Sequence, residues 1–410
     1  MTADAKMNPP WLSLIGLGKD GDLQEPACAL LSAAKIVYGS DRHFALAGDI
    51  SGEKRHWPSP FSAVYDELKS LAGTPVAILA TGDPQWFGIG SALAGHFSAD
   101  EMRVLPTTSA FQLAAARLRW PLQNVDCISL HGRPVETLRS FLYPGARILA
   151  LTSNGETPQQ VADILADGGF GHTRMHVLEK MGGSDERLVS STAEGWTEAV
   201  DNFHTLALDV VADPGTRFLP RTPGLPDDAF RHDGKMTKRE VRAVTLAALM
   251  PHPDACLWDI GSGCGSIGIE WMRSARGAKA IGLEPHDDRR TIAAENAVAL
   301  GVPGFELKNA QAPEALEELA KPDAIFIGGG LTAAGMIDAC HKALTPGGRL
   351  VANAVTLESE AVLLGAHQRY GGELTRLSIQ RASPVGHLTG WRPHMPVTQW
   401  ALVKGSQEQS

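Results

Sequence analysis

Short apolar runs that end in polar or glycine-rich turns recur along the whole chain. In the first half they alternate with stretches of helical periodicity such as residues 24–34, which is the pattern of an α/β domain. Between residues 173 and 211 short strands follow one another without a helix, which predicts a mixed, partly antiparallel sheet. The strands predicted in this half comprise residues 11–15, 36–38, 75–80, 104–105, 127–130, 147–152, 173–179, 186–190 and 205–211.

A proline-rich stretch breaks this periodicity. Residues 213–226 include Pro214, Pro220, Pro223 and Pro226 and show neither helical nor strand spacing. Such a composition is typical of a linker between domains. The predicted organisation is a first domain of residues 1–212, the linker 213–226, a second domain of residues 227–404 and a flexible tail of residues 405–410.

The second domain begins with a helix and then alternates strands with helices. Thr237 and Glu240 have the spacing of a capping box ahead of a helix that runs to about Leu249. Towards its end, strands at 374–380 and 397–403 follow each other without a long helix between them. An antiparallel closing pair of this kind indicates a class I methyltransferase fold, which is Rossmann-like, rather than a dinucleotide-binding fold.

A glycine-rich turn follows the buried strand 257–260. Glycines at alternate positions let the backbone approach a ligand closely, since glycine has no Cβ and tolerates positive φ. The spacing of Gly263, Gly265 and Gly268 also matches the dinucleotide fingerprint, so an NAD site is the alternative interpretation. Asp259 would repel a pyrophosphate but suits the sulfonium and ammonium groups of S-adenosylmethionine, and this favours a methyltransferase.

An acidic residue stands at the end of the next strand. Glu284 follows the run 278–283, where a carboxylate accepts hydrogen bonds from the ribose hydroxyls of either cofactor. The turn after the third strand lies where the adenine is expected. The predicted cofactor contacts in this domain are Asp259, Gly261, Ser262, Gly263, Gly265, Ser266, Glu284, Ala310 and Gln311.

Composition restricts the class of protein. A length of 410 residues predicts two or three domains, and 43% hydrophobic with 20% charged residues is typical of a globular protein. The net charge of −9 argues against nucleic-acid binding, and the five scattered cysteines predict neither a disulfide frame nor a metal site. Because no apolar run is long enough to span a membrane and residues 1–6 lack the apolar core of a signal peptide, we expect a cytoplasmic enzyme without membrane partners.

Polar turns follow several strands of the first domain. They are the loop 16–21, the Thr-Gly-Asp-Pro turn at 81–84, the hydroxyl-rich turn 107–109 and the Ser-Leu-His-Gly-Arg segment 129–133. In this order they resemble the tetrapyrrole methylase family, and within it the precorrin-6Y methylating branch. The resemblance implies two α/β lobes with S-adenosylmethionine bound in the cleft between them. The cofactor contacts that it implies are Gly82, Asp83, Thr107, Thr108 and Ser109.

Five blocks of the second domain, 236–238, 259–263, 312–316, 326–329 and 353–358, resemble the decarboxylating precorrin-6Y C-15 methyltransferase family. Together the two resemblances imply methylation of precorrin-6B at C-5 and C-15 and loss of carbon dioxide from the ring C acetate, giving precorrin-8X in cobalamin biosynthesis. They also imply two S-adenosylmethionine sites, a polyanionic tetrapyrrole substrate and a homo-oligomer. The fusion resembles the metal-free route; a cobalt-precorrin substrate and a non-enzymatic tetrapyrrole carrier with degenerate sites are the alternatives.

A reduced tetrapyrrole offers nucleophilic carbons, so methyl transfer needs positioning and electrostatics rather than a side-chain nucleophile. His131 is a candidate proton carrier, and Asn353 and Glu358 are candidates for orienting the reacting acetate. Their alternative roles are a structural turn, strand termination and helix capping. Substrate carboxylates match basic side chains, whose alternative role is solvated surface charge. The candidate substrate contacts are Arg117, Arg119, Arg133, Thr237, Lys238, Arg239 and Arg242.

Overall fold

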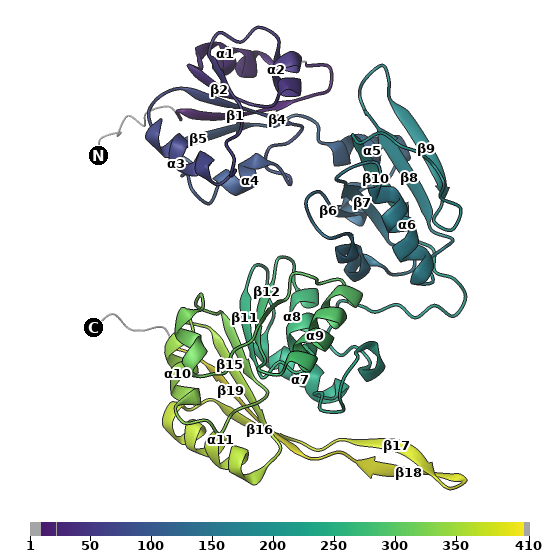
Figure 1. Cartoon of the computed structure of the whole chain (residues 1–410), viewed down its shortest axis with the longest axis vertical. Helices are drawn as coiled ribbons and strands as arrows, with labels where there is room; N and C mark the ends of the chain where they lie inside the picture. Colours follow the sequence, from purple (N-terminus) through teal and green to yellow (C-terminus); the bar gives the residue numbers. More distant parts are fainter. Residues whose placement is uncertain (1–9, 22, 406–410) are drawn as a thin grey trace, which may run out of the picture. The chain divides into compact units, whose positions relative to one another are not determined.

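The computed structural model describes residues 10–21 and 23–405 (Figure 1). The expectations for residues 1–6 and for most of the tail therefore lie outside the described residues. Contacts within the chain divide it into two units, of which the first comprises Met1–Arg133 and Pro144–Thr216 and the second Pro134–Tyr143 and Arg217–Ser410. In the described part of the chain, no helix is long and apolar enough to cross a bilayer.

The first unit contains an all-parallel sheet with the order β3-β2-β4-β1-β5. Alternate residues of β1 enter different cores: Leu12 and Leu14 pack with α3, whereas Ile15 and Leu17 pack with α1. Helices thus cover both faces, as continuous apolar strands require. The elements are β1 (Leu12–Leu17), α1 (Glu25–Ala33), β2 (Ile36–Tyr38), α2 (Asp41–Ala47), β3 (Glu53–Arg55), α3 (Ala63–Ser70), β4 (Val76–Thr81), α4 (Ile89–Leu93) and β5 (Met102–Leu105).

A second sheet of the same unit has the order β6-β7-β10-β8-β9. Only β6 and β7 are parallel, because β8, β9 and β10 are joined without intervening helices. This confirms the mixed sheet that the sequence predicts. The elements are α5 (Ala110–Leu118), η1 (Leu122–Asn124), β6 (Asp126–Ser129), β7 (Arg147–Leu151), α6 (Thr157–Asp167), β8 (Arg174–Glu179), β9 (Arg187–Thr192) and β10 (His204–Asp209).

The second unit is built on a seven-stranded sheet with the order β13-β12-β11-β14-β15-β19-β16. Six strands run in one direction, and β19 alone runs antiparallel, between β15 and β16, which confirms the predicted antiparallel closing pair. Leu257 of β11 packs with α7, α8 and α9, whereas Trp258 packs with α10 and α11 on the other face. The strands are β11 (Cys256–Ile260), β12 (Lys279–Leu283), β13 (Glu306–Lys308), β14 (Ala324–Ile327), β15 (Arg349–Ala354), β16 (Glu373–Leu377) and β19 (Val397–Val403).

The first helix of this sheet begins later than predicted. The helices are α7 (Arg239–Leu249), α8 (Ser266–Ser274), α9 (Asp287–Ala299), α10 (Met336–Ala343) and α11 (Leu357–Tyr370), with short turns η3 (Asp227–Ala229) and η4 (Glu314–Glu318). The predicted capping box is wrong, because Lys238 occupies the N-cap and makes no side-chain cap. Asp227 instead accepts a hydrogen bond from the Arg239 amide at 2.8 Å, and Glu240 binds Arg381.

A two-stranded hairpin of β17 (Gln380–Val385) and β18 (Leu388–Pro393) lies between β16 and β19 in sequence and extends away from the large sheet (Figure 1). Its side chains Leu388 and Trp391 are largely exposed. At its base Arg381 binds Asp227 at 2.8 Å and Glu240 at 2.5 Å. The sequence prediction of a simple closing pair did not include this hairpin.

The second unit also includes a segment that is distant in sequence. Residues 134–143, which contain η2 (Val135–Phe141), lie between β6 and β7 along the chain but belong to this unit. The Ser140 hydroxyl donates to the Gly301 carbonyl at 2.8 Å, and Leu138 is fully buried. Gly301 has a φ of +77°, and a Cβ on it would lie 2.6 Å from the Ser140 amide nitrogen. Close backbone contact therefore holds this segment against the end of α9.

Candidate functional site

The glycine-rich turn of the second unit joins β11 to α8. Gly261 and Gly265 have φ angles of +71° and +80°, which favour glycine. A Cβ at Gly261 would lie 2.7 Å from the Gly329 amide nitrogen, and one at Gly265 would lie 2.9 Å from the Phe305 ring. The tight strand–turn–helix that the sequence predicts is therefore enforced by sterics as well as by φ.

Asp259 is a buried carboxylate at the end of β11, with 1% of its surface exposed. Its Oδ2 accepts a hydrogen bond from the Gly268 amide at 2.9 Å, and no ion pair neutralises it among the described residues. Burial, with a smaller contribution from Glu284, raises the pKa of Asp259 to about 7. A carboxylate desolvated without a cationic partner is suited to a ligand that brings a positive charge.

Glu284 follows β12, which pairs with β11, so its carboxylate stands at the same sheet edge as Asp259. It is 2% exposed, and its Oε2 and Oε1 accept from the amides of Gly263 at 3.0 Å and His286 at 3.1 Å. Each oxygen keeps further acceptor capacity for ligand hydroxyls. The nearby Ser262 hydroxyl is buried and finds no partner in the described structure. These groups fit a cofactor that carries both hydroxyls and a cation.

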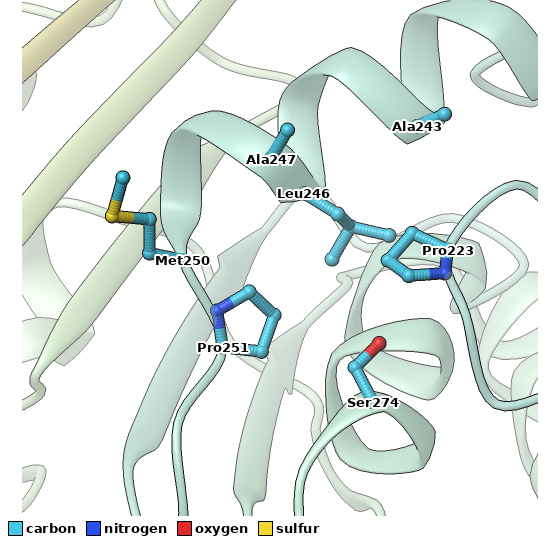
Figure 2. A pocket seen from close by; sticks show the side chains of 7 residues that line it. All are labelled: Pro223, Ala243, Leu246, Ala247, Met250, Pro251 and Ser274. Carbon is cyan, nitrogen blue, oxygen red and sulfur yellow. The ribbon is translucent and has the colours of Figure 1, made fainter.

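Two hollows of different character occur in the second unit. The larger, of about 440 Å³, is lined mainly by apolar side chains between α7 and α8 (Figure 2). The smaller, of about 50 Å³, lies at the glycine-rich turn, and its lining includes an aspartate, a hydroxyl-bearing loop and a lysine. The smaller pocket, called the cofactor pocket below, is the candidate cofactor site because the chemistry of its lining matches. Its lining residues are Lys235, Met236, Thr237, Asp259, Gly261, Ser262, Gly263, Cys264, Ser266, Ile267, Phe326 and Gly328.

Arg242 requires a correction as a substrate contact. Its side chain has no exposed surface, and its guanidinium binds the Glu270 carboxylate at 2.5 Å. The same guanidinium donates to the carbonyls of Thr237, at 2.6 Å, and Leu225. All of these partners are internal, so Arg242 fixes the segment that lines the pocket instead of reaching a substrate.

The remaining candidates of the second unit are spread over the same sheet. Asn353 donates to Thr245 at 2.9 Å and accepts from Gln399 at 2.9 Å, in a polar cluster between α7, β15 and β19. Glu358 is exposed in the first turn of α11. Other candidates lie on loops or helix ends and stay predictions: Ala310 and Gln311 after β13, Lys238 at the N-cap of α7, and exposed Arg239.

In the first unit, three strand ends meet at the predicted cofactor contacts. The Thr107 amide donates to the Gly82 carbonyl at 3.3 Å, which joins the ends of β5 and β4. A Cβ on Gly16 of β1 would collide with that carbonyl. Asp83 accepts from the Gln85 amide at 2.9 Å, and Ser109 caps α5. Thr108 is exposed beside them.

The basic candidates of the first unit differ in their surroundings. His131 is exposed, and its Nδ1 lies 3.1 Å from the Thr152 carbonyl oxygen, which requires a proton on Nδ1 and leaves Nε2 as the basic atom. Arg117 is paired with Glu186 at 2.5 Å. Arg133 lies over the Phe87 ring, 5.8 Å from its centroid, and Arg119 ends α5.

Sequence reasoning missed several residues that line the cofactor pocket. Lys235 and Met236 precede α7 in a loop without periodicity, and Cys264, Phe326 and Gly328 come from two strand ends. Met236 belongs to a block that carries the family resemblance, so it could have been predicted as a pocket residue from the sequence. Nothing in the sequence marked Lys235 as a pocket residue, because a lysine in a polar loop is ordinarily solvated.

The comparisons with known proteins divide along the chain. Residues 14–195 match the Tetrapyrrole (Corrin/Porphyrin) Methylases family, and residues 228–404 match the Precorrin methyltransferase domain family. A Sinorhizobium protein named precorrin-6Y C(5,15)-methyltransferase [decarboxylating] is 48% identical over 97% of this chain and 97% of its own. A Mycobacterium tuberculosis protein of the same name is 41% identical over 95% of this chain and 99% of its own.

A solved structure matches the second half. The C-terminal domain of precorrin-6Y C5,15-methyltransferase from Rhodobacter capsulatus is 43% identical to the part of this chain that it matches. It covers 45% of this chain and 100% of its own, with a TM-score of 0.43. The alignments with the Sinorhizobium and Mycobacterium relatives span both of the segments that match a family.

Proposed function

This chain belongs to the family of decarboxylating precorrin-6Y C(5,15)-methyltransferases, and from that premise we propose that it methylates precorrin-6B at C-5 and C-15. The same reaction removes the ring C acetate carboxyl as carbon dioxide and gives precorrin-8X in cobalamin biosynthesis. The observation that carries the proposal is the buried Asp259 carboxylate, which has no cationic partner within the described chain, at the end of β11. Such a group suits a cationic cofactor and not a pyrophosphate.

Each half of the chain holds one S-adenosylmethionine in this proposal. When bound, the cofactor supplies an electrophilic methyl group on its sulfonium. In the second unit Asp259 holds the ammonium group, Glu284 accepts from the ribose hydroxyls and Ser262 gains its missing partner. In the first unit the turns after β4 and β5 supply Gly82, Asp83, Thr107, Thr108 and Ser109.

The protein contributes positioning and proton handling. His131 accepts a proton at Nε2 during the C-5 step, since its Nδ1 proton is held by the Thr152 carbonyl. Asn353 and Glu358 orient the acetate that is lost. Substrate carboxylates are bound by Arg117, Arg119, Arg133, Thr237, Lys238 and Arg239.

The natural substrate in this proposal is a metal-free precorrin. The three relatives that match nearly the whole chain in the comparison carry names without cobalt, which supports this choice over a cobalt-precorrin. A homo-oligomer in the cytoplasm is part of the same proposal, resting on the family resemblance and on the lack of a spanning helix among the described residues.

Incubation of the whole chain with metal-free precorrin-6B and isotopically labelled S-adenosylmethionine tests this function. We expect a product that has gained two labelled methyl groups and lost one carbon dioxide, detected by mass spectrometry. Tight binding of the tetrapyrrole without formation of S-adenosylhomocysteine would instead support the carrier alternative.

A further inference from the structure

The segment 235–237, called the pocket wall below, contributes three adjacent residues to the lining of the cofactor pocket. Among the twelve residues that line it, Asp259 is the one carboxylate and Lys235 the one cation. The pocket therefore offers complementary groups to a ligand with charges of both signs. Asp259 can bind the positive charge of such a ligand. Lys235 can bind its negative charge.

The backbone of the pocket wall is fixed on both sides of Lys235. The Lys235 amide donates to Asp233 Oδ1 at 3.0 Å, and the other carboxylate oxygen of Asp233 binds Arg289 at 2.8 Å. After Lys235, Met236 is 6% exposed within the core, and the Thr237 carbonyl accepts from Arg242 at 2.6 Å. The position from which the Lys235 side chain starts is thus set by four separate contacts.

Among the residues that the structure describes, the Lys235 side chain makes no hydrogen bond or ion pair, and its ammonium group interacts with the Asp233 carboxylate only through longer-range electrostatic attraction. The nearby carboxylate is that of Asp233, which already binds the Lys235 amide and Arg289, and these contacts hold the pKa of Asp233 below its usual range. Lys235 is exposed at the border of the pocket that contains the buried Asp259, so its ammonium group is accessible to a ligand there.

We propose that Lys235 is a carboxylate-binding residue at the mouth of the second unit's cofactor pocket. This inference rests on the proposed function, which supplies two sources of that chemistry. One is the carboxylate of the methionine part of S-adenosylmethionine, and the other is an acetate of the tetrapyrrole. An ammonium group serves either one, because it is a compact charge with three donors on a flexible stem.

Binding of S-adenosylhomocysteine to the full chain, measured by calorimetry, separates the two sources. The relevant binding step is the one that Asp259→Ala removes. The variant is Lys235→Met, which keeps the length of the side chain and removes its charge. Lys235→Arg keeps the charge, and Lys279→Met removes an exposed lysine from the start of β12, away from the pocket.

If Lys235 holds the cofactor's carboxylate, Lys235→Met weakens the binding of S-adenosylhomocysteine roughly tenfold or more. This is the usual effect of losing a charge-assisted hydrogen bond. Binding of 5′-methylthioadenosine, which lacks that carboxylate, stays unchanged. If Lys235 holds a substrate acetate, S-adenosylhomocysteine binding is unchanged, and KM rises roughly tenfold for C-15 methylation but not for C-5 methylation. Lys235→Arg retains most of the function in either case.

Unchanged cofactor affinity together with unchanged KM in Lys235→Met would overturn the proposal. An equal loss in Lys279→Met would also overturn it, since the effect would then come from net charge. Failure of the wild-type chain to methylate precorrin-6B is a separate outcome. It would contradict the proposed function, whereas the effect of Lys235→Met on S-adenosylhomocysteine binding would still test the role of Lys235.

Discussion

At the scale of single residues, the site depends on a carboxylate in an unfavourable position. Asp259 is buried with one amide donor and no counter-ion in the described chain, so its charged form is destabilised until a cation arrives. Glu284 is equally buried, but its carboxylate accepts hydrogen bonds from two backbone amides instead of one. In the proposed site, the two acids at the carboxyl ends of β11 and β12 would serve different parts of one ligand.

Cofactor affinity in the second unit is expected to depend on pH. The ligand's ammonium group binds the ionised form of Asp259, whose pKa is raised to about 7, so affinity increases as pH rises from about 6 to about 8. Calorimetric titration of S-adenosylhomocysteine over this range measures the effect. Asp259→Asn should bind more weakly and lose the pH dependence of this step. If the affinity of the Asp259→Asn variant still rises with pH as steeply as that of the wild type, a group other than Asp259 is responsible for the pH dependence.

The same residue should make the ligand-free protein less stable at alkaline pH. A carboxylate whose folded pKa lies above its unfolded value contributes stability that is present below the unfolded pKa and is lost as pH rises through the folded pKa. The Asp259→Asn variant is therefore expected to melt at a higher temperature than wild type at about pH 8, and at a similar temperature near pH 4. Thermal unfolding without cofactor measures this difference; a lower Tm of the variant at pH 8 would contradict it.

At the scale of elements, buried polar contacts hold the pocket wall in place. Arg242 of α7 joins Glu270 of α8 to the carbonyls of Thr237 and Leu225. Glu270 also accepts from the amides of Gly224 and Leu225, at 2.6 and 3.0 Å. The segment before α7 is therefore anchored to two helices, which explains how a loop without periodicity can form part of a site.

Replacing Arg242 by methionine should destabilise the protein by about 3–5 kcal/mol, because Glu270 would remain buried without its cation. Chemical denaturation, followed for the second unit by the fluorescence of its buried tryptophans, measures the loss. Arg242→Met combined with Glu270→Gln should recover part of it. A variant of normal stability with only a raised KM for the tetrapyrrole would show that Arg242 contacts the substrate.

The contact between residues 134–143 and α9 should depend on Gly301. Gly301→Ala introduces a Cβ 2.6 Å from the Ser140 amide nitrogen and should therefore increase amide hydrogen exchange in residues 134–143. Gly347→Ala is the matched control, because Gly347 has a φ of +80° but nothing near its Cβ position. It should cost about 1 kcal/mol without that increase. If both variants increase amide hydrogen exchange in residues 134–143 equally, backbone strain at a positive φ, and not the Cβ contact with Ser140, would explain the effect.

The fold followed from local patterns, whereas several features of the site did not. Asp259 and Glu284 each end an apolar run, and these runs alternate with helices along the chain. Strands that alternate with helices form a parallel sheet, so both acids were predicted to lie at the carboxyl ends of its strands. Arg242 looked like a surface cation because its buried partner Glu270 lies 28 residues away. The packing of 134–143 and the hairpin β17–β18 likewise depend on contacts far apart in sequence, which periodicity does not register.

At the scale of the whole molecule, one chain combines two methyltransferase families. Their sheets differ in kind: the first unit has a parallel and a mixed sheet of five strands each, and the second has one seven-stranded sheet with an antiparallel closing pair. The proposed function accordingly places one cofactor site in each framework, made from the strand ends of that framework. The proposal of two sites predicts that a change in one leaves the chemistry of the other intact.

Mass spectrometry of the product formed from metal-free precorrin-6B by Asp259→Asn tests this claim most directly. Two separate sites predict that methylation at C-15 and loss of carbon dioxide disappear while methylation at C-5 continues. The expected product carries one added methyl group and retains the ring C acetate. Equal loss of both methylations, or retention of both, would contradict the assignment of Asp259 to a second, independent cofactor site.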